Sequence, residues 1–253
     1  MEQEKVVLAR ETTPQGEIQL QQWIETDGPG QPVYEIIFNG VFLMASYNER
    51  SGKAVATLAI EPLAEERRAM RVLIGGLGMG YTLQAALDYD GIQAVDVVEI
   101  EGHIISWARR FFGELNGHAL SDPRVRLIQM DLGDYLFQTQ KTYDAIVLDV
   151  DNGPTWLALE SNQRLYERPT LARMKELLAK GGVLTVWAAE KCPDFQKRLE
   201  EVFGQAEEIT VQETDRRGRP TDYFIYRARE WGKSETRFLR ENGFLGVTNN
   251  RQG

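Results

Sequence analysis

The sequence predicts a doubly wound α/β fold: a Rossmann-like, seven-stranded sheet preceded by a small N-terminal antiparallel β lid. A glycine-rich turn joins an apolar run to a helical pattern within residues 71–87, as in nucleotide-binding βα units. From there on, strand and helix patterns alternate, which is typical of a parallel sheet covered by helices. The last two strand patterns, 206–213 and 221–229, are joined by a short loop and must therefore pair antiparallel.

Residues 1–52 are predicted to form the lid. Their apolar residues alternate or cluster in short runs, which are separated by turns at 14–16 and 27–30. We expect the lid also to join two copies of the chain in a homodimer, because an exposed apolar strand edge such as 34–38 is suited to pairing. The predicted strands are 6–9, 18–24, 34–38 and 42–46.

Residues 53–230 are predicted to form the ligand-binding domain, and residues 231–253 a polar tail with a docked turn of helix followed by disorder. The domain begins with helical segments over 54–69, which Pro62 interrupts because it lacks the N–H that a helix interior requires. Gly181-Gly182 is expected to end the helix predicted over residues 170–180. The later strands are 71–74, 94–101, 125–130, 143–150 and 183–187, and the later helices are 82–89, 103–115, 134–139, 170–180 and 194–203.

The turn after the strand 71–74 has the composition of a nucleotide cradle. Glycine tolerates positive φ and lets the backbone approach a ligand that a Cβ would exclude. The following helix offers unpaired N–H groups and the positive end of its dipole. A simple tight turn between strand and helix is the alternative explanation of such a motif. The candidate cofactor-binding glycines are Gly75, Gly76, Gly78 and Gly80.

Carboxylates stand at the ends of the next strands. Glu99 occupies the position where doubly wound folds place the acid that accepts hydrogen bonds from ribose hydroxyls. Asp131 follows the third strand, and Asp149 and Asp151 follow the fourth. Because ligands bind outside the carboxyl ends of parallel strands, we expect these acids to converge on one crevice. A helix N-cap or an Asx-turn is the alternative role for each acid taken singly.

Composition narrows the classes of function. The net charge of −9 disfavours binding to nucleic acid or anionic membranes and would attract a cationic substrate. The single cysteine, Cys192, and the two histidines, His103 and His118, form no metal-ligand pattern, so we expect no metal site. The sequence shows no transmembrane span, and residues 1–5 lack the basic start and apolar run of a secretory signal. A cytoplasmic protein is therefore expected.

Five parallel strands followed by an antiparallel hairpin is the layout of class I S-adenosylmethionine-dependent transferases, whereas a dehydrogenase would continue with a parallel sixth strand. The chain also contains the motifs Ile-Gly-Gly-Leu-Gly-Met-Gly at 74–80, Val-Glu-Ile-Glu at 98–101, Asp-Pro-Arg-Val at 122–125, Leu-Asp at 148–149 and Gly-Gly-Val-Leu at 181–184. Through these motifs, residues 34–229 resemble the spermidine/spermine synthase family. The resemblance implies that Glu99 binds the ribose, Asp131 the adenine amino group, and Asp149 the reacting end of the site.

Three departures from this family bear on function. Gly78 replaces the loop aspartate that holds the amino group of decarboxylated S-adenosylmethionine, and Asn152 replaces the second catalytic aspartate, with Asp151 one place earlier. The Tyr-His-Glu segment that grips the polyamine is absent near residues 48–53. Since intact S-adenosylmethionine carries a carboxylate that a loop aspartate would repel, Gly78 favours the intact cofactor. The N–H groups of the loop could donate hydrogen bonds to that carboxylate.

We therefore expect S-adenosylmethionine-dependent methyl transfer to a small, cationic amine-type acceptor. Asp149 and Asp151 are the candidate catalytic residues, since they could orient the amine and take up its proton. Asn152, Trp156 and Tyr166 are candidate substrate-binding residues, and packing in the core or rim is the alternative for both rings. Two other functions stay open: aminopropyl transfer from the decarboxylated cofactor to a polyamine, with Asp151 as the substitute acid, and non-catalytic nucleoside binding or assembly.

Overall fold

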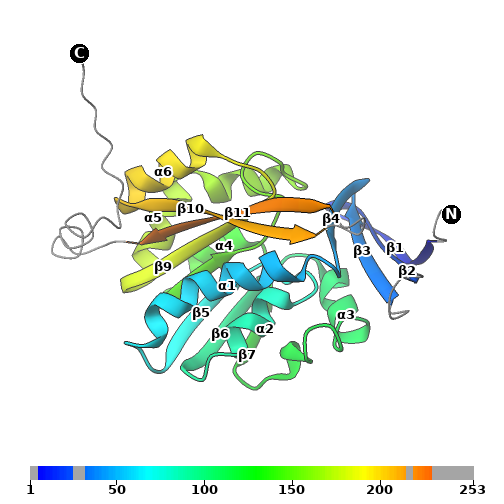
Figure 1. Cartoon of the computed structure of the whole chain (residues 1–253), viewed down its shortest axis with the longest axis horizontal. Coiled ribbons are helices and arrows are strands. Elements are labelled where there is room, and N and C mark those ends of the chain that lie inside the picture. Colours follow the sequence, from blue (N-terminus) through cyan, green and yellow to red (C-terminus); the bar gives the residue numbers. More distant parts are fainter. Residues whose placement is uncertain (1–4, 25–31, 215–218, 230–253) are drawn as a thin grey trace, which may run out of the picture.

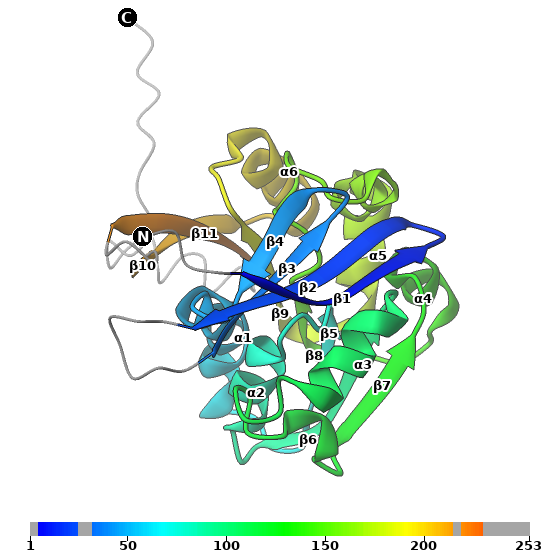
Figure 2. The same cartoon turned by 90° about the vertical axis from the view of Figure 1, so that its right-hand side faces the viewer.

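A computed structural model describes residues 5–24, 32–214 and 219–229 of the chain. It contains a four-stranded antiparallel sheet and a seven-stranded mixed sheet with helices on both faces. The small sheet stands at one end of the large one (Figure 1), and Figure 2 looks onto it with the large sheet behind. This arrangement confirms the predicted fold class. Among the helices that the structure describes, none is long and apolar enough to cross a membrane.

The lid consists of β1 (Val6–Thr13), β2 (Gly16–Ile24), β3 (Pro32–Phe38) and β4 (Val41–Ala45), in that order across the sheet. The apolar run 34–38 was expected to be an exposed strand edge, but this prediction is wrong. These residues lie in β3, which pairs with β2 on one side and with β4 on the other. The outer edge belongs instead to β1, where Val6 and Val7 are about half exposed. The predicted turn at 27–30 lies outside the described residues.

The large sheet has the strand order β10-β11-β9-β8-β5-β6-β7. The five adjacent strands from β9 to β7 run parallel. As predicted, β10 and β11 form an antiparallel hairpin, and β11 also pairs antiparallel with β9. The strands are β5 (Met70–Gly75), β6 (Ile92–Glu99), β7 (Val125–Gln129), β8 (Tyr143–Leu148), β9 (Leu178–Ala188), β10 (Ala206–Thr214) and β11 (Pro220–Arg229). The α-helices are α1 (Glu49–Ala64), α2 (Tyr81–Leu87), α3 (Gly102–Arg110), α4 (Leu132–Gln138), α5 (Arg168–Leu177) and α6 (Pro193–Phe203), with 3-10 turns at Ala119–Ser121 and Glu160–Tyr166.

Pro62 does not interrupt the first helix, which runs unbroken to Ala64 and begins at Glu49, before the predicted domain boundary. A proline in a helix leaves the carbonyl four residues earlier without its N–H partner. Here that carbonyl, of Leu58, accepts a hydrogen bond of 3.3 Å from the Arg227 guanidinium of β11. A contact distant in sequence therefore compensates for the proline.

Gly181-Gly182 does not end a helix either, because α5 already ends at Leu177 and both glycines lie within β9. Tyr143 of β8 pairs with Leu178, but Ala145 pairs with Val183, so β9 bulges between these pairs. Gly181 has φ +69° at the bulge, a conformation that favours glycine. The helix expected over 103–115 also ends early, at Arg110.

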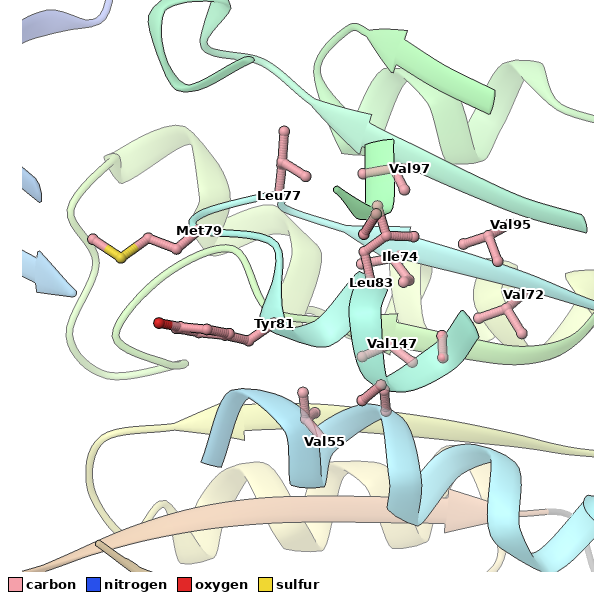
Figure 3. Close-up of a cluster of buried hydrophobic side chains, with 14 of the residues drawn as sticks. Val55, Val72, Ile74, Leu77, Met79, Tyr81, Leu83, Val95, Val97 and Val147 are labelled. Carbon is pink, nitrogen blue, oxygen red and sulfur yellow. The ribbon is translucent and has the colours of Figure 1, made fainter. Parts of the chain in front are cut away.

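Alternate residues of the parallel strands face opposite sides of the sheet, and each side has its own core. One core lies against the lid, α1, α2 and α3, and the other lies against α4, α5 and α6. Leu73 of β5, for example, belongs to the second core, while its neighbours Val72 and Ile74 belong to the first. Figure 3 shows part of the first core, where Val72, Ile74, Val95, Val97 and Val147 of the strands approach Val55 of α1 and Leu83 of α2.

A buried polar cluster around Asp96 stabilises the second core. Asp96 Oδ2 accepts hydrogen bonds from Lys141 Nζ at 2.6 Å, Tyr143 Oη at 2.7 Å and Tyr135 Oη at 3.0 Å. Burial raises the pKa of Asp96, but these hydrogen bonds more than offset that effect and leave the pKa lowered. A carboxyl with a lowered pKa stabilises the folded state above the pKa of the unfolded chain, and this contribution is lost as the pH falls through the folded pKa.

We expect Asp96→Asn to lower the free energy of unfolding by about 1–3 kcal/mol at pH 7, because buried hydroxyls and Lys141 lose a charged acceptor. The difference from wild type should shrink below about pH 4, where the unfolded carboxyl is protonated. Urea denaturation of wild type and variant at pH 3 and pH 7 measures this difference in the free energy of unfolding. Asp222→Asn, at an exposed position, is the control and should change little. An equal destabilisation by Asp96→Asn at pH 3 and pH 7 would contradict the charged role.

Candidate active site

A cavity of about 380 Å³ lies between the lid and the carboxyl ends of β5, β6, β7 and β8. This is the place where open α/β sheets bind ligands. Most residues proposed from the sequence line it: Gly76, Gly78, Glu99, Asp131, Asp149, Asp151, Asn152 and Trp156. Gly75, Gly80 and Tyr166 are not part of its wall. Within the described parts of the chain, no three His, Cys, Asp or Glu side chains gather in a way that could hold a metal ion.

The glycine loop after β5 has no room for side chains. A Cβ on Gly76, whose φ is +89°, would lie 2.0 Å from the backbone oxygen of Asp149. A Cβ on Gly78, whose φ is +50°, would lie 2.7 Å from Met44 Sδ of the lid. The loop therefore presents backbone to the cavity, as a cradle for a ligand requires. Gly75 and Gly80 serve packing, because a Cβ there would meet Leu132 and Asn116 respectively.

Glu99 fixes the glycine loop to the end of β6. Its side chain is buried, with Oε2 accepting the Leu77 N–H at 2.9 Å and Oε1 accepting the Glu101 N–H at 2.8 Å. Burial raises the pKa of Glu99, and these backbone hydrogen bonds counter the effect in part. The carboxylate thus holds two buried N–H groups while it faces the cavity, where each oxygen retains a further lone pair for a ligand hydroxyl.

Asp131 and Glu101 both cap helices at the rim of the cavity. Asp131 Oδ1 accepts the Asp134 N–H at 3.0 Å as the N-cap of α4, and it also pairs with Arg164. Glu101 accepts the His103 N–H at 3.1 Å as the N-cap of α3. The capping role considered for Asp131 is therefore present, and its binding to adenine stays a prediction that would use the remaining oxygen.

Asp149, just after β8, is a cavity carboxylate whose side chain makes one hydrogen bond within the described part of the chain. Asp149 Oδ2 lies within hydrogen-bond distance of the Thr82 hydroxyl, which also reaches the Gly52 carbonyl oxygen at 2.9 Å. Burial raises the pKa of Asp149 to about 6, and the hydrogen bond from Thr82 lowers it only in part. A buried carboxyl that titrates near neutral pH is suited to accept and release a proton.

The side chains of Asp151 and Asn152, unlike that of Asp149, form hydrogen bonds with the loop at 158–162 and with the lid. Asp151 Oδ1 accepts the Ala158 N–H and Oδ2 accepts the Asn162 side-chain amide, both at 2.7 Å. Burial raises the pKa of Asp151. Asn152 donates its amide to the Phe42 carbonyl of the lid at 3.3 Å. The geometry therefore gives Asp151 a role in holding the loop after β8, and gives Asn152 a role in holding the lid over the cavity.

The two aromatic candidates are placed differently. Trp156 lines the mouth of the cavity and is 49% exposed. Tyr166 is buried and packs edge-to-face on Phe195, with ring centroids 5.6 Å apart. For Tyr166 the structure favours the packing alternative over a stacking role, because its ring belongs to the second core.

One wall of the cavity, which was not predicted from the sequence, contains Trp187 of β9 and Tyr223 of β11. Their ring centroids are 5.1 Å apart, with the planes tilted by 32°. Asn48 donates to Tyr223 Oη at 3.0 Å and, at 3.2 Å, to Glu213 of β10. These residues lie on strands and near a helix start, in patterns that indicate secondary structure, so only the folded arrangement shows that they share a cavity.

The chain is similar to known proteins over most of this region. Residues 55–211, more than half of the chain, match the model of the spermine/spermidine synthase domain. A putrescine N-methyltransferase 2 of Nicotiana attenuata is 34% identical over 130 residues, which are 50% of this chain and 33% of that protein. The polyamine aminopropyltransferase of Saccharolobus solfataricus is 26% identical over 208 residues, 79% of this chain and 65% of that protein. The matched region thus spans only about a third of the N-methyltransferase.

The fold comparison agrees. A spermidine synthase solved in complex with the transition-state analogue AdoDATO superposes with a TM-score of 0.70 at 18% identity, covering 89% of this chain and 74% of that one. The spermidine synthase of Thermotoga maritima gives a TM-score of 0.68 at 17% identity, with coverage of 89% and 73%. The match over residues 55–211 is the one that decides the family: the chain belongs to the spermine/spermidine synthase family.

Proposed function

We propose that this protein transfers the methyl group of S-adenosylmethionine to an amine. The observation that carries the choice of methyl is the apolar surrounding of the loop at Gly78, where the lid places Met44 instead of an acid. A carboxylate of the cofactor would meet no repelling charge at this position, and loop N–H groups could donate hydrogen bonds to it. The putrescine N-methyltransferases among the relatives support the same reaction.

The residues of the cavity fit this cofactor. Gly76 and Gly78 line the cavity and have no room for a Cβ, so the loop offers backbone there, and Glu99 presents a buried acceptor beside it. We assign the nucleoside to this end, with Glu99 accepting from the ribose hydroxyls and Asp131 from the adenine amino group. When bound, S-adenosylmethionine supplies an electrophilic methyl group on a sulfonium.

Asp149 has the acid–base role in this proposal. An amine reacts only through its free lone pair, so its ammonium form must first lose a proton. The buried carboxylate can take that proton and orient the nitrogen, and it returns the proton to solvent afterwards. Asp151 supports the site by holding residues 158–162 in place.

Aminopropyl transfer from decarboxylated S-adenosylmethionine is the second candidate. It is favoured by the broad match to the Saccharolobus solfataricus aminopropyltransferase, which covers 79% of this chain. The two reactions share the nucleoside end of the cavity and differ in the group that faces Gly78.

We also propose a division of the chain into a lid (1–52), a catalytic domain (53–230) and a tail (231–253), and a cytoplasmic homodimer joined through the lid. The half-exposed Val6 and Val7 on the outer edge of β1 support the choice of the lid as the contact.

Calorimetric titration of the wild-type protein tests the function. We expect tight binding of S-adenosylmethionine and weak binding of its decarboxylated form and of methylthioadenosine. Preference for the latter two would select aminopropyl transfer, and no binding of any of the three would select a non-catalytic role. The titration uses the wild-type protein and not a Gly78 variant. A side chain at Gly78 would be strained by the φ of +50° and would displace Met44.

A further inference from the structure

The turn between β5 and α2 is fixed where it begins and where it ends. At its start, the Leu77 N–H donates to Glu99 at 2.9 Å. At its end, the Gly80 N–H donates to the Leu77 carbonyl oxygen at 2.9 Å. Gly78, with its φ of +50°, lies between these contacts. Residues 77–80 therefore form a closed, hydrogen-bonded turn at the edge of the cavity.

The side chain of Asn116 holds this turn from outside the cavity. Asn116 follows α3, is only 2% exposed and does not line the cavity. Its Nδ2 donates to the Met79 carbonyl oxygen at 2.8 Å, and its Oδ1 accepts the Ala119 N–H at 3.2 Å. Because the first partner can only accept and the second can only donate, the pair of contacts requires an amide side chain in this orientation.

Gly80 is the residue that admits this contact. A Cβ on Gly80 would lie 2.6 Å from Asn116 Nδ2 and would push the amide away from the Met79 carbonyl. Asn116 is itself fixed, because its own N–H donates to the carbonyl oxygens of Phe112 at 3.1 Å and Gly113 at 3.3 Å. The segment between α3 and β7 thus serves as a rigid support behind the glycine loop.

The supported turn leaves two N–H groups for a ligand. Within the described parts of the chain, the N–H groups of Gly78 and Met79 donate to no protein atom, and Gly78 lines the cavity. Asn116 meanwhile binds the Met79 carbonyl oxygen outside the cavity, so this oxygen is kept away from a bound anion. Consecutive free N–H groups in a turn are suited to receive a carboxylate.

We infer that Asn116 is a positioning residue for the cofactor. Through the Met79 carbonyl it sets the orientation of the turn whose N–H groups receive the carboxylate of S-adenosylmethionine. This inference rests on the proposed function for the identity of the ligand, whereas the support of the turn by Asn116 does not depend on it. Loss of Asn116 should therefore affect the amino-acid end of the cofactor and spare the nucleoside end.

Two variants of nearly unchanged size test this role. Asn116→Asp keeps the acceptor for Ala119 but removes the donor to Met79, and Asn116→Leu removes both. Loss of one supporting hydrogen bond should lower the affinity of either variant for S-adenosylmethionine about tenfold, and that for methylthioadenosine, which lacks the amino-acid end, less than about threefold. Calorimetry measures both affinities. Equal losses for the two ligands would overturn the assignment.

Hydrogen exchange followed by NMR tests the support of the turn without any ligand. The amides of Leu77 and Gly80 should exchange roughly tenfold faster in both Asn116 variants than in wild type, because the turn opens more often. Asp96→Asn is the control: it should lower the stability of the protein through the second core but leave these exchange rates and both affinities unchanged.

The two measurements separate the inference from the proposed function. If the wild type binds S-adenosylmethionine no better than methylthioadenosine, the proposed function fails, and the exchange rates alone decide whether Asn116 positions the turn. If Leu77 and Gly80 exchange at the wild-type rate in the Asn116 variants, the inference is wrong whatever the protein binds.

Discussion

Asp149→Asn should lower the rate of methyl transfer by about 10²- to 10⁴-fold, the usual contribution of a positioned acid–base group. Asparagine has the same shape and can still accept the Thr82 hydroxyl, but it cannot take a proton from the amine. The affinity for S-adenosylmethionine and the free energy of unfolding should change little. Single-turnover transfer assays and calorimetry measure the two properties separately.

The pH profile provides the control for this variant. Because burial raises the pKa of Asp149 to about 6, kcat/KM of the wild type should rise as the pH increases through 6 and this carboxyl ionises. Asp149→Asn should lack that limb of the profile. A variant that keeps the wild-type rate, or keeps the same limb, would show that another group accepts the proton.

Glu99→Ala should weaken the binding of S-adenosylmethionine by roughly 10- to 100-fold. The substitution removes the acceptor of the buried Leu77 and Glu101 N–H groups, and each buried group without a partner costs on the order of 1–3 kcal/mol. The glycine loop would lose its attachment to β6, and the ribose hydroxyls would lose their proposed partner. Calorimetry gives the affinity, and thermal denaturation gives the stability.

A comparison of ligands separates these two effects of Glu99. Adenosine should bind the wild type more tightly than 2′,3′-dideoxyadenosine, and Glu99→Ala should abolish that preference if the carboxylate contacts the ribose. A preference that survives in the folded variant would leave Glu99 with the loop alone. Asp131→Asn, a change at the same rim, should preserve the preference.

The order of elements could be predicted from the sequence because it depends on local signals. Apolar strands, glycine turns and the closing hairpin each leave a pattern that neighbouring residues complete. The errors arose where distant residues decide the outcome. Pro62 continues α1 because Arg227 bonds the freed carbonyl of Leu58, and Gly181 lies inside β9 because the pairing with β8 needs a bulge.

The same distinction applies to the site. Acids at strand ends could be located along the chain, because parallel strands bring their carboxyl ends together. The hydrogen-bond partners of these acids could not be predicted from the sequence. That Asp151 holds Ala158 and Asn162 depends on the path of a loop, and the wall of Trp187 and Tyr223 depends on the pairing of β9 with β11. Side-chain direction within an element, not the element itself, was the missing information.

The hydroxyl of Thr82 has a single hydrogen and two oxygens that could receive it, those of Asp149 and Gly52. While Asp149 is ionised, the Thr82 hydroxyl donates its hydrogen to the carboxylate, and the Gly52 carbonyl receives no hydrogen bond from Thr82. Once Asp149 holds a proton, the acid itself can donate to Thr82, and the hydroxyl turns toward Gly52 in the first turn of α1. Each proton that Asp149 takes from the substrate amine would thus reverse the direction of these hydrogen bonds. The Gly52 carbonyl at the start of α1 would gain or lose a hydrogen bond according to whether Asp149 is neutral or ionised.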